Sequence, residues 1–300
     1  MSMQTILIAG ASGLVGGELT RFLSAAGHRV LPLRRNSQTA PFWDIERKII
    51  ELGDCGPIDA VINLAGENIA AGRWTAARKE RIRQSRIEST CLLAEFFAAA
   101  KQKPKVLISA SAIGFYGDQG DEKLTEASPA GIGFLAETAQ AWEAATQPAT
   151  AAGIRTVQLR LGVVLSPAGG ALAKMLPSFT MGLGGVLGSG RQWMSWISLH
   201  ELPGIIKQIF AHEELRGPVN AVSPGPISNR DFTRTLATVL RRPALLPAPR
   251  LLLKLLLGEM ADELLLASAK VQPRLLLNSG YVFLEPELEP ALRHLLCKPG

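Results

Sequence analysis

Glycines near the start of the chain have the spacing of a phosphate-binding turn. Gly10, Gly13 and Gly16 follow an apolar strand predicted for residues 4–9, and an amphipathic helix is predicted for residues 14–26. Gly10 allows a tight turn, Gly13 lets the backbone approach a pyrophosphate, and Gly16 lets the helix pack on a sheet. The N–H groups and the positive dipole end of the helix attract phosphates. The spacing predicts a dinucleotide site whose expected contacts are Gly10, Ser12, Gly13, Leu14, Val15 and Gly16.

Two arginines follow the second predicted strand, residues 28–33, at the position that distinguishes the two nicotinamide dinucleotides. An acid at this position bonds the ribose hydroxyls of NAD, whereas an arginine pairs with the 2′-phosphate of NADP. The chain has Arg34 and Arg35 here, and no acid before Asp44. The arginines therefore favour NADP(H) as the cofactor. The alternative is that they are two solvated residues at a strand end.

The segments around these residues alternate between strand and helix, which predicts a parallel sheet covered by helices. Further strands are expected at 60–64, 105–109, 156–161 and 218–221, with a short one near 48–52, and helices at 75–101, 134–152 and 200–212. The rest of 36–57 is expected to be irregular. The fold class is therefore α/β, a Rossmann-type doubly wound parallel sheet with ligands at the carboxyl ends of its strands.

The texture of the sequence changes after Val164, where glycines and prolines become frequent. We expect residues 1–222 to form the nucleotide-binding domain, with 165–195 contributing to a substrate lobe. Residues 223–300 should form a small, mostly helical lobe that covers the strand ends. The most apolar stretch, 251–257, is too short to span a bilayer of roughly 30 Å, and it predicts a buried helix.

Composition narrows the class of protein. The chain has 300 residues, of which 47% are hydrophobic, so it can bury an ample core. Cys55, Cys91 and Cys297 lie far apart, which indicates reduced thiols and predicts neither a disulfide frame nor a metal site.

The net charge of +6 is spread along the chain. The densest basic run, residues 78–86, contains Glu80 and is typical of a helix face, so no nucleic-acid partner is expected. The first strand begins close to Met1, which predicts no signal peptide. We therefore expect a cytoplasmic protein with no membrane partner.

Four segments resemble the motifs of the extended short-chain dehydrogenase/reductases, the class of sugar epimerases and dehydratases. Residues 10–16 match the glycine motif, and Asn63-Leu64-Ala65-Gly66 matches the turn that lies along the cofactor. Residues 109–117 match the serine-bearing end of the next strand, and residues 160–164 resemble the segment that passes the nicotinamide. The resemblance covers nearly the whole chain.

A narrower match is to the atypical epimerase-like subfamily that includes human SDR family 39U proteins and bacterial proteins of the YfcH type. It rests on short motifs in order: 66–69, 73–74, 85–86, 133–137, 142–143, 169–172, 188–192 and 196–197. That subfamily carries its own C-terminal domain, which matches residues 248–296 here. The resemblance implies no particular substrate.

The resemblance implies roles for several residues. Leu64, Ala65 and Gly66 should line the cofactor, and Arg34 and Arg35 lie where relatives hold the 2′-phosphate. Arg86 lies where relatives contact the cofactor from a helix, although it can also be an ordinary helix-surface arginine. Val163 should lie near the nicotinamide. Relatives of this broad class often dimerise through a helix pair, so a homodimer is one assembly that the resemblance allows.

The Tyr-x-x-x-Lys pair of this class is missing. In relatives, the lysine and the cofactor ribose lower the tyrosine pKa, so that the tyrosine exchanges a proton with a carbonyl or alcohol. Aligning the helix on Trp142-Glu143 puts Leu135 at the tyrosine position and Ala139 at the lysine position. Neither side chain can transfer a proton.

Three interpretations follow. The protein can be an oxidoreductase or epimerase-like enzyme that uses a different acid, and Ser111, Tyr116 and Glu137 are the candidate catalytic residues because each should lie near the nicotinamide end. It can instead bind NADP(H) without turnover and report redox state to a protein partner. It can also be a scaffold whose cofactor is structural. Each candidate side chain has a purely structural alternative.

Indole and basic groups predict the lining of a substrate pocket for a flat or anionic small molecule. The candidates are Asn68, Arg73, Trp74, Arg191 and Trp193. The alternative is that they pack the two lobes together and leave the arginines on the surface.

Overall fold

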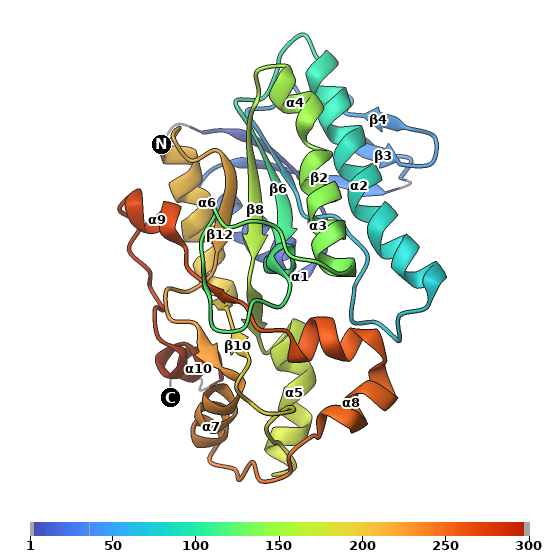
Figure 1. Ribbon diagram of the computed structural model, residues 1–300. Helices are drawn as coiled ribbons and strands as arrows, with labels where there is room; N and C mark the ends of the chain where they lie inside the picture. The colour runs from blue at the N-terminus through green and yellow to red at the C-terminus, as the bar shows by residue number, and fades with distance from the viewer. Residues whose placement is uncertain (1–2, 36, 297–300) are drawn as a thin grey trace.

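The core of the protein is an eight-stranded sheet in the strand order β12-β8-β6-β5-β1-β2-β3-β4 (Figure 1). The structure is a computed structural model that describes residues 3–35 and 37–296. The strands are β1 (Thr5–Ala9), β2 (Arg29–Arg35), β3 (Phe42–Asp44), β4 (Ile49–Glu51), β5 (Ala60–Asn63), β6 (Val106–Ala112), β8 (Arg155–Leu161) and β12 (Gly217–Ala221). Only the β3–β4 pair is antiparallel among these neighbours. The α/β fold class is confirmed.

Helices cover both faces of the sheet because side chains alternate along each strand. On β1, Ile6 and Ile8 pack in the core beneath α1 (Leu14–Ala25) and α6 (Leu202–Ala211). Leu7 and Ala9 point to the opposite core, which α2 (Ala76–Ala99) covers. The helices α3 (Phe134–Ala144) and α4 (Gln147–Ala151) lie beside α2 (Figure 1). The sheet is therefore a buried middle layer.

A second, largely helical lobe lies below the strand ends in Figure 1. A separate core that includes Leu172, Phe179, Trp196 and Phe232 holds it together. Its helices are α5 (Gly170–Thr180), α7 (Asn229–Leu240), α8 (Arg250–Leu257) and α10 (Leu288–Leu296), with a π-helical turn at Ala261–Leu266, while α9 (Arg274–Asn278) packs beside β12 on the main domain. Short strands join it to the main domain: β7 (Lys123–Leu124), β9 (Val163–Ser166), β10 (Trp193–Met194), β11 (Trp196–Ser198), β13 (Ile227–Ser228) and β14 (Lys270–Val271). The helical C-terminal lobe is confirmed, whereas a domain boundary at residue 222 stays a prediction.

Three expectations about local structure were wrong. The helix expected at 134–152 is two helices, and Pro148 lies in the first turn of the second, where its missing N–H does no harm. The stretch 36–57 contains β3 as well as β4. The sequence did not predict β3, because three residues are too few to show a pattern. The Gly- and Pro-rich stretch after Val164 holds α5, which its composition did not indicate.

The apolar stretch 251–257 was expected to form a buried helix, and it is not buried. It lies in α8, where only Leu253 is buried. Leu251, Leu252, Leu255 and Leu256 are 79%, 47%, 71% and 59% exposed. Apart from Arg250 and Lys254, this short helix consists of leucines, so the sequence did not show that only Leu253 would pack.

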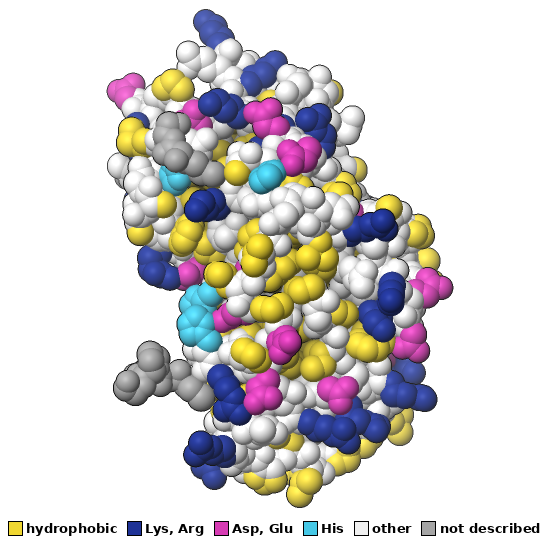
Figure 2. Space-filling model, turned by 90° about the vertical axis from the view of Figure 1, so that its left-hand side faces the viewer, with side chains coloured by type: hydrophobic (Ala, Val, Ile, Leu, Met, Phe, Trp, Pro, Cys, Tyr) yellow, Lys and Arg dark blue, Asp and Glu magenta, His cyan; other side chains and the backbone are white. Residues whose placement is uncertain are grey.

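Figure 2 shows the face on the left of Figure 1. Hydrophobic side chains gather across the middle of this face, with charged side chains above and below them. In residues 3–35 and 37–296, no helix has the length and apolar character needed to cross a membrane.

Candidate functional site

The turn between β1 and α1 leaves room only for glycine. Gly10 has a φ of +80°, and a Cβ on it would lie 2.8 Å from the carbonyl carbon of Leu64. A Cβ on Gly16 would lie 2.1 Å from the carbonyl oxygen of Gly10. No side chain caps the start of α1, and its first turn holds no acid. The first N–H groups of α1 are therefore open to an anion, as a pyrophosphate cradle requires.

The other glycine-turn residues surround this opening. Gly13 is the N-cap of α1, and Ser12 is exposed beside it. Leu14 and Val15 are partly buried against the core. Leu14 also reaches the start of α5, where a Cβ on Gly169 would lie 3.4 Å from it.

The turn after β5 is fixed by buried hydrogen bonds. Asn63 Nδ2 donates to Thr90 Oγ1 at 2.8 Å, and Asn63 Oδ1 accepts from the Ala65 N–H at 3.2 Å. Both bonds orient Leu64 and Ala65 beside the glycine turn, because the β5 strand pairs directly with β1. The carboxyl ends of β1 and β5 thus form one wall of the predicted cofactor site.

Arg86 supports this wall from α2. Its guanidinium donates to the carbonyl oxygens of Ile82 and Glu67 at 2.9 and 3.0 Å, and it packs under Gly66. Burial lowers the pKa of Arg86 to about 10. The side chain holds the loop that begins at Gly66, and its direct contact with a cofactor stays a prediction.

Arg34 and Arg35 lie exposed beside the glycine turn. Leu33 pairs with Ala9 in the parallel β1–β2 ladder, so the two arginines begin level with Gly10. Their backbone pairs with Phe42 and Trp43 of β3, which anchors the strand end. Neither arginine has an ion-pair partner in the described part of the chain, and Asn36 lies outside it. Two uncompensated positive charges therefore border the open end of α1.

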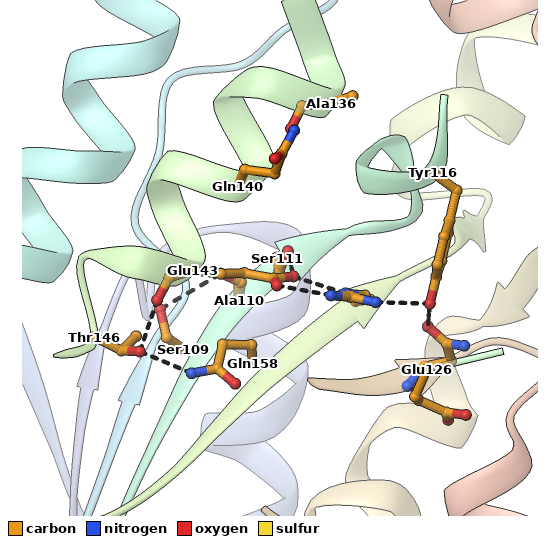
Figure 3. A network of polar contacts seen from close by, with 12 residues as sticks. Ser109, Ala110, Ser111, Tyr116, Glu126, Ala136, Gln140, Glu143, Thr146 and Gln158 are labelled. Carbon is orange, nitrogen blue, oxygen red and sulfur yellow. Dashed lines mark hydrogen bonds and ion pairs between the residues drawn. The ribbon is translucent and has the colours of Figure 1, made fainter. Parts of the chain in front are cut away.

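A chain of buried polar side chains lies near the carboxyl ends of β6, β8 and β12, on the other side of β5 from the glycine turn (Figure 3). Ser111 Oγ donates to Glu143 Oε1 at 2.7 Å. Arg160 holds both oxygens of Glu143, with Nε and Nη2 each at 2.8 Å. Its Nη1 donates to the Tyr116 hydroxyl at 2.9 Å, and that hydroxyl donates to Asn220 Oδ1 at 2.7 Å. This network links β6, α3, β8 and β12.

The charges in this network are stabilised by one another. Burial opposes the charge on Arg160, but Glu143 outweighs this effect and raises the pKa of the guanidinium. The guanidinium also lies 3.5 Å from the centre of the Phe115 ring. Burial raises the pKa of Tyr116, whose side chain is fully enclosed. Tyr116 is thus a neutral hydrogen-bonding member of the network at physiological pH.

The positions that carry Tyr-x-x-x-Lys in relatives are apolar here and closely packed. A Cβ on Gly114 would lie 3.2 Å from Leu135, and Ala139 is buried. The N–H groups of Phe134 and Leu135 donate to Glu263 at 2.9 and 2.7 Å. A carboxylate from the C-terminal lobe therefore caps α3 at the point where the standard site would begin.

The structure separates the three candidate catalytic side chains. Ser111 and Tyr116 belong to the buried network, at either end of the Glu143–Arg160 pair. Glu137 is exposed and lines a cavity of about 590 Å³ between α2 and α3. Their catalytic roles stay predictions.

The candidate substrate residues form two groups. Trp74 meets Phe134 edge-on with ring centres 5.0 Å apart, and it lines the cavity that contains Glu137. Arg73 lies beside Gly258, and Asn68 bonds within its own loop through the Ala70 N–H. These three residues share the 66–75 loop.

Trp193 belongs to the second group of candidate substrate residues. Its Nε1 donates to Asp121 at 2.7 Å, and Lys270 lies 3.8 Å from its ring centre. Arg191 is exposed nearby on the chain. Val163 begins β9, which pairs with β11 rather than with the main sheet. A shared substrate pocket for the two groups stays a prediction.

Sequence reasoning gave no role to the residues that hold the network together. Glu143, Arg160 and Asn220 each lie in a segment correctly predicted as helix or strand. The first two also belong to the motifs 142–143 and 160–164, but none of the three was predicted as a site residue. Arg160 carried a usable signal, since a charge inside the apolar strand 156–161 needs a buried partner. Glu263 carried none, because its partners are backbone groups 128 and 129 residues away.

Comparison with protein families gives two matches along the chain. Residues 6–220 match the NAD dependent epimerase/dehydratase family. Residues 248–295 match a domain of unknown function, DUF1731. The first match spans the sheet domain and α5, and the second spans α8, α9 and most of α10.

Individual proteins match over the full length. An epimerase family protein of Mycobacterium bovis is 41% identical over 304 residues and covers 100% of both chains. The Bacillus subtilis epimerase family protein YfhF is 37% identical, covering 97% of this chain and 98% of its own. The crystal structure of human epimerase family protein SDR39U1 with NADPH has a TM-score of 0.88 at 33% identity, covering 97% and 98% of the two chains.

Proposed function

The chain belongs to the NAD dependent epimerase/dehydratase family, and we propose that it binds NADP(H) and acts as an oxidoreductase or epimerase-like enzyme on a small carbonyl or alcohol. The observation that carries this proposal is the open start of α1 beside two exposed arginines. A related human protein of the same fold was crystallised with NADPH.

The residues present fit such a cofactor. The N–H groups that follow Gly13 would hold the pyrophosphate, and Arg34 with Arg35 would hold the 2′-phosphate. Leu64 and Ala65 would lie along the ribose and the nicotinamide half. When bound, NADP(H) supplies or accepts the hydride, so the protein must position the substrate and manage a proton.

We propose Ser111 as the side chain that contacts the reacting oxygen. Its hydroxyl hydrogen points at Glu143, which leaves the lone pairs of Oγ free to accept a hydrogen bond. When a substrate alcohol is oxidised, its hydroxyl proton would pass to Ser111 Oγ while the serine proton passes to the Glu143 carboxylate. In reduction the two protons would move back. Whenever Glu143 is ionised, Arg160 would compensate its charge.

Turnover of NADPH with a panel of carbonyl compounds, followed by absorbance, tests this function. We expect Ser111→Ala to lower kcat by about 10²–10⁴-fold and to leave NADPH affinity unchanged, because the lost group acts only on the proton. Ser109→Ala is the matched control, since Ser109 is an equally buried serine two residues earlier on β6. Full activity in Ser111→Ala would remove the serine from the mechanism.

A second role is decided by the same panel. Tight NADPH binding without turnover of any compound would favour a redox sensor that acts through a protein partner. Where the panel does show turnover, Glu137→Gln tests Glu137 as the acid, because Glu137 lines the cavity beside Trp74.

A further inference from the structure

A groove of about 760 Å³ lies on the outer side of the C-terminal lobe. It runs between α7 and the segments 186–189 and 243–247. The charged side chains that line it are all arginines: Arg230, Arg234, Arg241 and Arg242. Such a lining attracts an anionic partner, because like charges gathered over a concave apolar surface focus the electric field.

The arginines form a row rather than a single cluster. Arg230, Arg234 and Arg241 lie along one helix and its end, so they span about 16 Å at 1.5 Å per residue. Arg230 donates to the carbonyl oxygen of Ser189 at 3.1 Å. Arg234 has one weak ion pair, with Asp231 at 3.7 Å. A row of this length fits several spaced negative charges better than one phosphate.

Arg241 and Arg242, like Arg230, carry charges that no carboxylate of the described residues compensates. Neither forms an ion pair with any residue in 3–35 or 37–296. Arg241 also has a φ of 53°, in the left-handed region where a helix end normally carries glycine. Glycine adopts this backbone conformation more readily than arginine does.

Apart from the arginines, the side chains that line the groove are mostly apolar. Val186, Pro243, Ala244 and Pro247 line it, together with Leu245. Leu245 is 80% exposed, and Leu246 and Leu183 beside it are 55% and 53% exposed. The surface therefore offers apolar contact between its positive charges.

We propose that this groove binds an acidic, amphipathic segment of a partner protein, with leucine-like side chains on the floor and carboxylates on the arginine row. A helix that places apolar residues in a groove and charges at its rim is a common recognition mode. A second copy of this chain does not fit, because a symmetric contact would bring arginines against arginines.

Fluorescence anisotropy with a labelled synthetic peptide tests the proposal on the full chain. The probe is a peptide with leucines at helical spacing and glutamates elsewhere, and its matched control has glutamine in place of every glutamate. We expect the glutamate peptide to bind about ten-fold tighter or more, and its affinity to fall as salt is raised. Equal binding of both peptides would overturn the proposal.

Charge reversal then locates the site. Arg234→Glu/Arg242→Glu should weaken the glutamate peptide about ten-fold or more, while Arg216→Glu/Arg274→Glu, with the same change in net charge elsewhere on the surface, should keep wild-type affinity. Unchanged melting temperature and NADPH affinity show that the variants fold. An equal loss in both double variants would reduce the effect to net charge and contradict a groove site.

Arg241→Gly separates binding from folding. Glycine relieves the left-handed strain, so the melting temperature should rise by about 2 °C while peptide affinity falls several-fold. A lower melting temperature with unchanged peptide affinity would mean that Arg241 is structural. Stronger binding to phosphatidylserine vesicles than to the peptide, lost in Arg234→Glu/Arg242→Glu, would replace the protein partner with a lipid surface. Displacement of the peptide by tripolyphosphate at equal concentration would replace it with a small phosphate ligand.

Discussion

The two ends of the predicted cofactor cleft differ in what their polar groups do. At the phosphate end, the N–H groups of α1 have no side-chain cap, and Arg34 and Arg35 have no ion-pair partner in the described chain. At the other end, Ser111, Glu143, Arg160 and Tyr116 bond to one another, and only the lone pairs of Ser111 Oγ stay open. The first region presents unpaired N–H donors and positive charges, whereas the charges of the second region pair with each other.

This difference shows how a family fold can keep cofactor binding while its chemistry changes. Phosphate binding depends on backbone geometry, which glycines fix locally. Proton transfer depends on two side chains, and Leu135 and Ala139 replace both. The chain therefore keeps the family's glycine turn, and catalysis by this chain stays a prediction that requires a different set of side chains.

Breaking the network should give the largest effect. Arg160→Met leaves Glu143 as a buried charge without its partner, so the free energy of unfolding should fall by about 3–5 kcal/mol. Urea denaturation measures the loss. Arg160→Met/Glu143→Leu should recover much of it, because neither charge is then left unpaired. A loss below about 1 kcal/mol in Arg160→Met would mean that the network does not hold this end together.

Reversing the charge at the phosphate end should weaken NADPH selectively. Arg34→Glu/Arg35→Glu should raise the Kd for NADPH about ten-fold or more, since a charge-assisted pair contributes about 1.5–3 kcal/mol. The Kd for NADH should change far less, because NADH lacks the 2′-phosphate. Calorimetric titration compares the two. An equal loss for both cofactors would refute the role of the strand-end arginines.

Removing the lobe-to-lobe cap should have a smaller effect. Glu263→Ala leaves the Phe134 and Leu135 N–H groups without their acceptor, which should cost about 1 kcal/mol. The melting temperature should fall by about 2 °C. Glu88→Ala, at an exposed position inside α2, is the control and should stay within about 0.5 kcal/mol. Similar losses in both variants would show that Glu263 is an ordinary surface carboxylate.

A tyrosine titration distinguishes a buried network from a catalytic tyrosine. The chain has two tyrosines, Tyr116 and Tyr281. Burial raises the pKa of both, and Glu201 adds to the effect on Tyr281. The native protein should therefore show tyrosinate absorbance only at higher pH than the unfolded chain, which titrates near pH 10.

The same pKa shifts predict how stability depends on pH. A folded pKa above the unfolded one favours the protonated native state, so this contribution is present below pH 10 and is lost as the pH rises further. A native tyrosine that ionises below pH 9 would contradict the buried network and restore Tyr116 as a proton donor.

The sequence predicted the parts of the fold that depend on local pattern. The glycine spacing at 10–16 and the apolar strands placed β1, β5, β6 and β8 correctly, because strand periodicity and turn chemistry act over a few residues. The predicted α8 helix was found, but its burial was not. Arg250 and Lys254 mark one polar side and leucines fill the rest, so the pattern does not single out Leu253. Burial is decided by what the rest of the chain leaves uncovered.

The site was predictable to the same extent. The phosphate end is formed by neighbouring residues, so the motif showed its geometry. The network joins side chains up to 104 residues apart, as Tyr116 and Asn220 are, and no local pattern pairs them. Arg160 shows the limit, since its strand was predicted and its partner Glu143 was not.

Calorimetric titration of the unmodified protein with NADPH and with NADH tests the central claim most directly. An open helix start beside two arginines predicts that NADPH binds about ten-fold tighter or more than NADH. Equal affinity for the two, or tighter binding of NADH, would contradict the account.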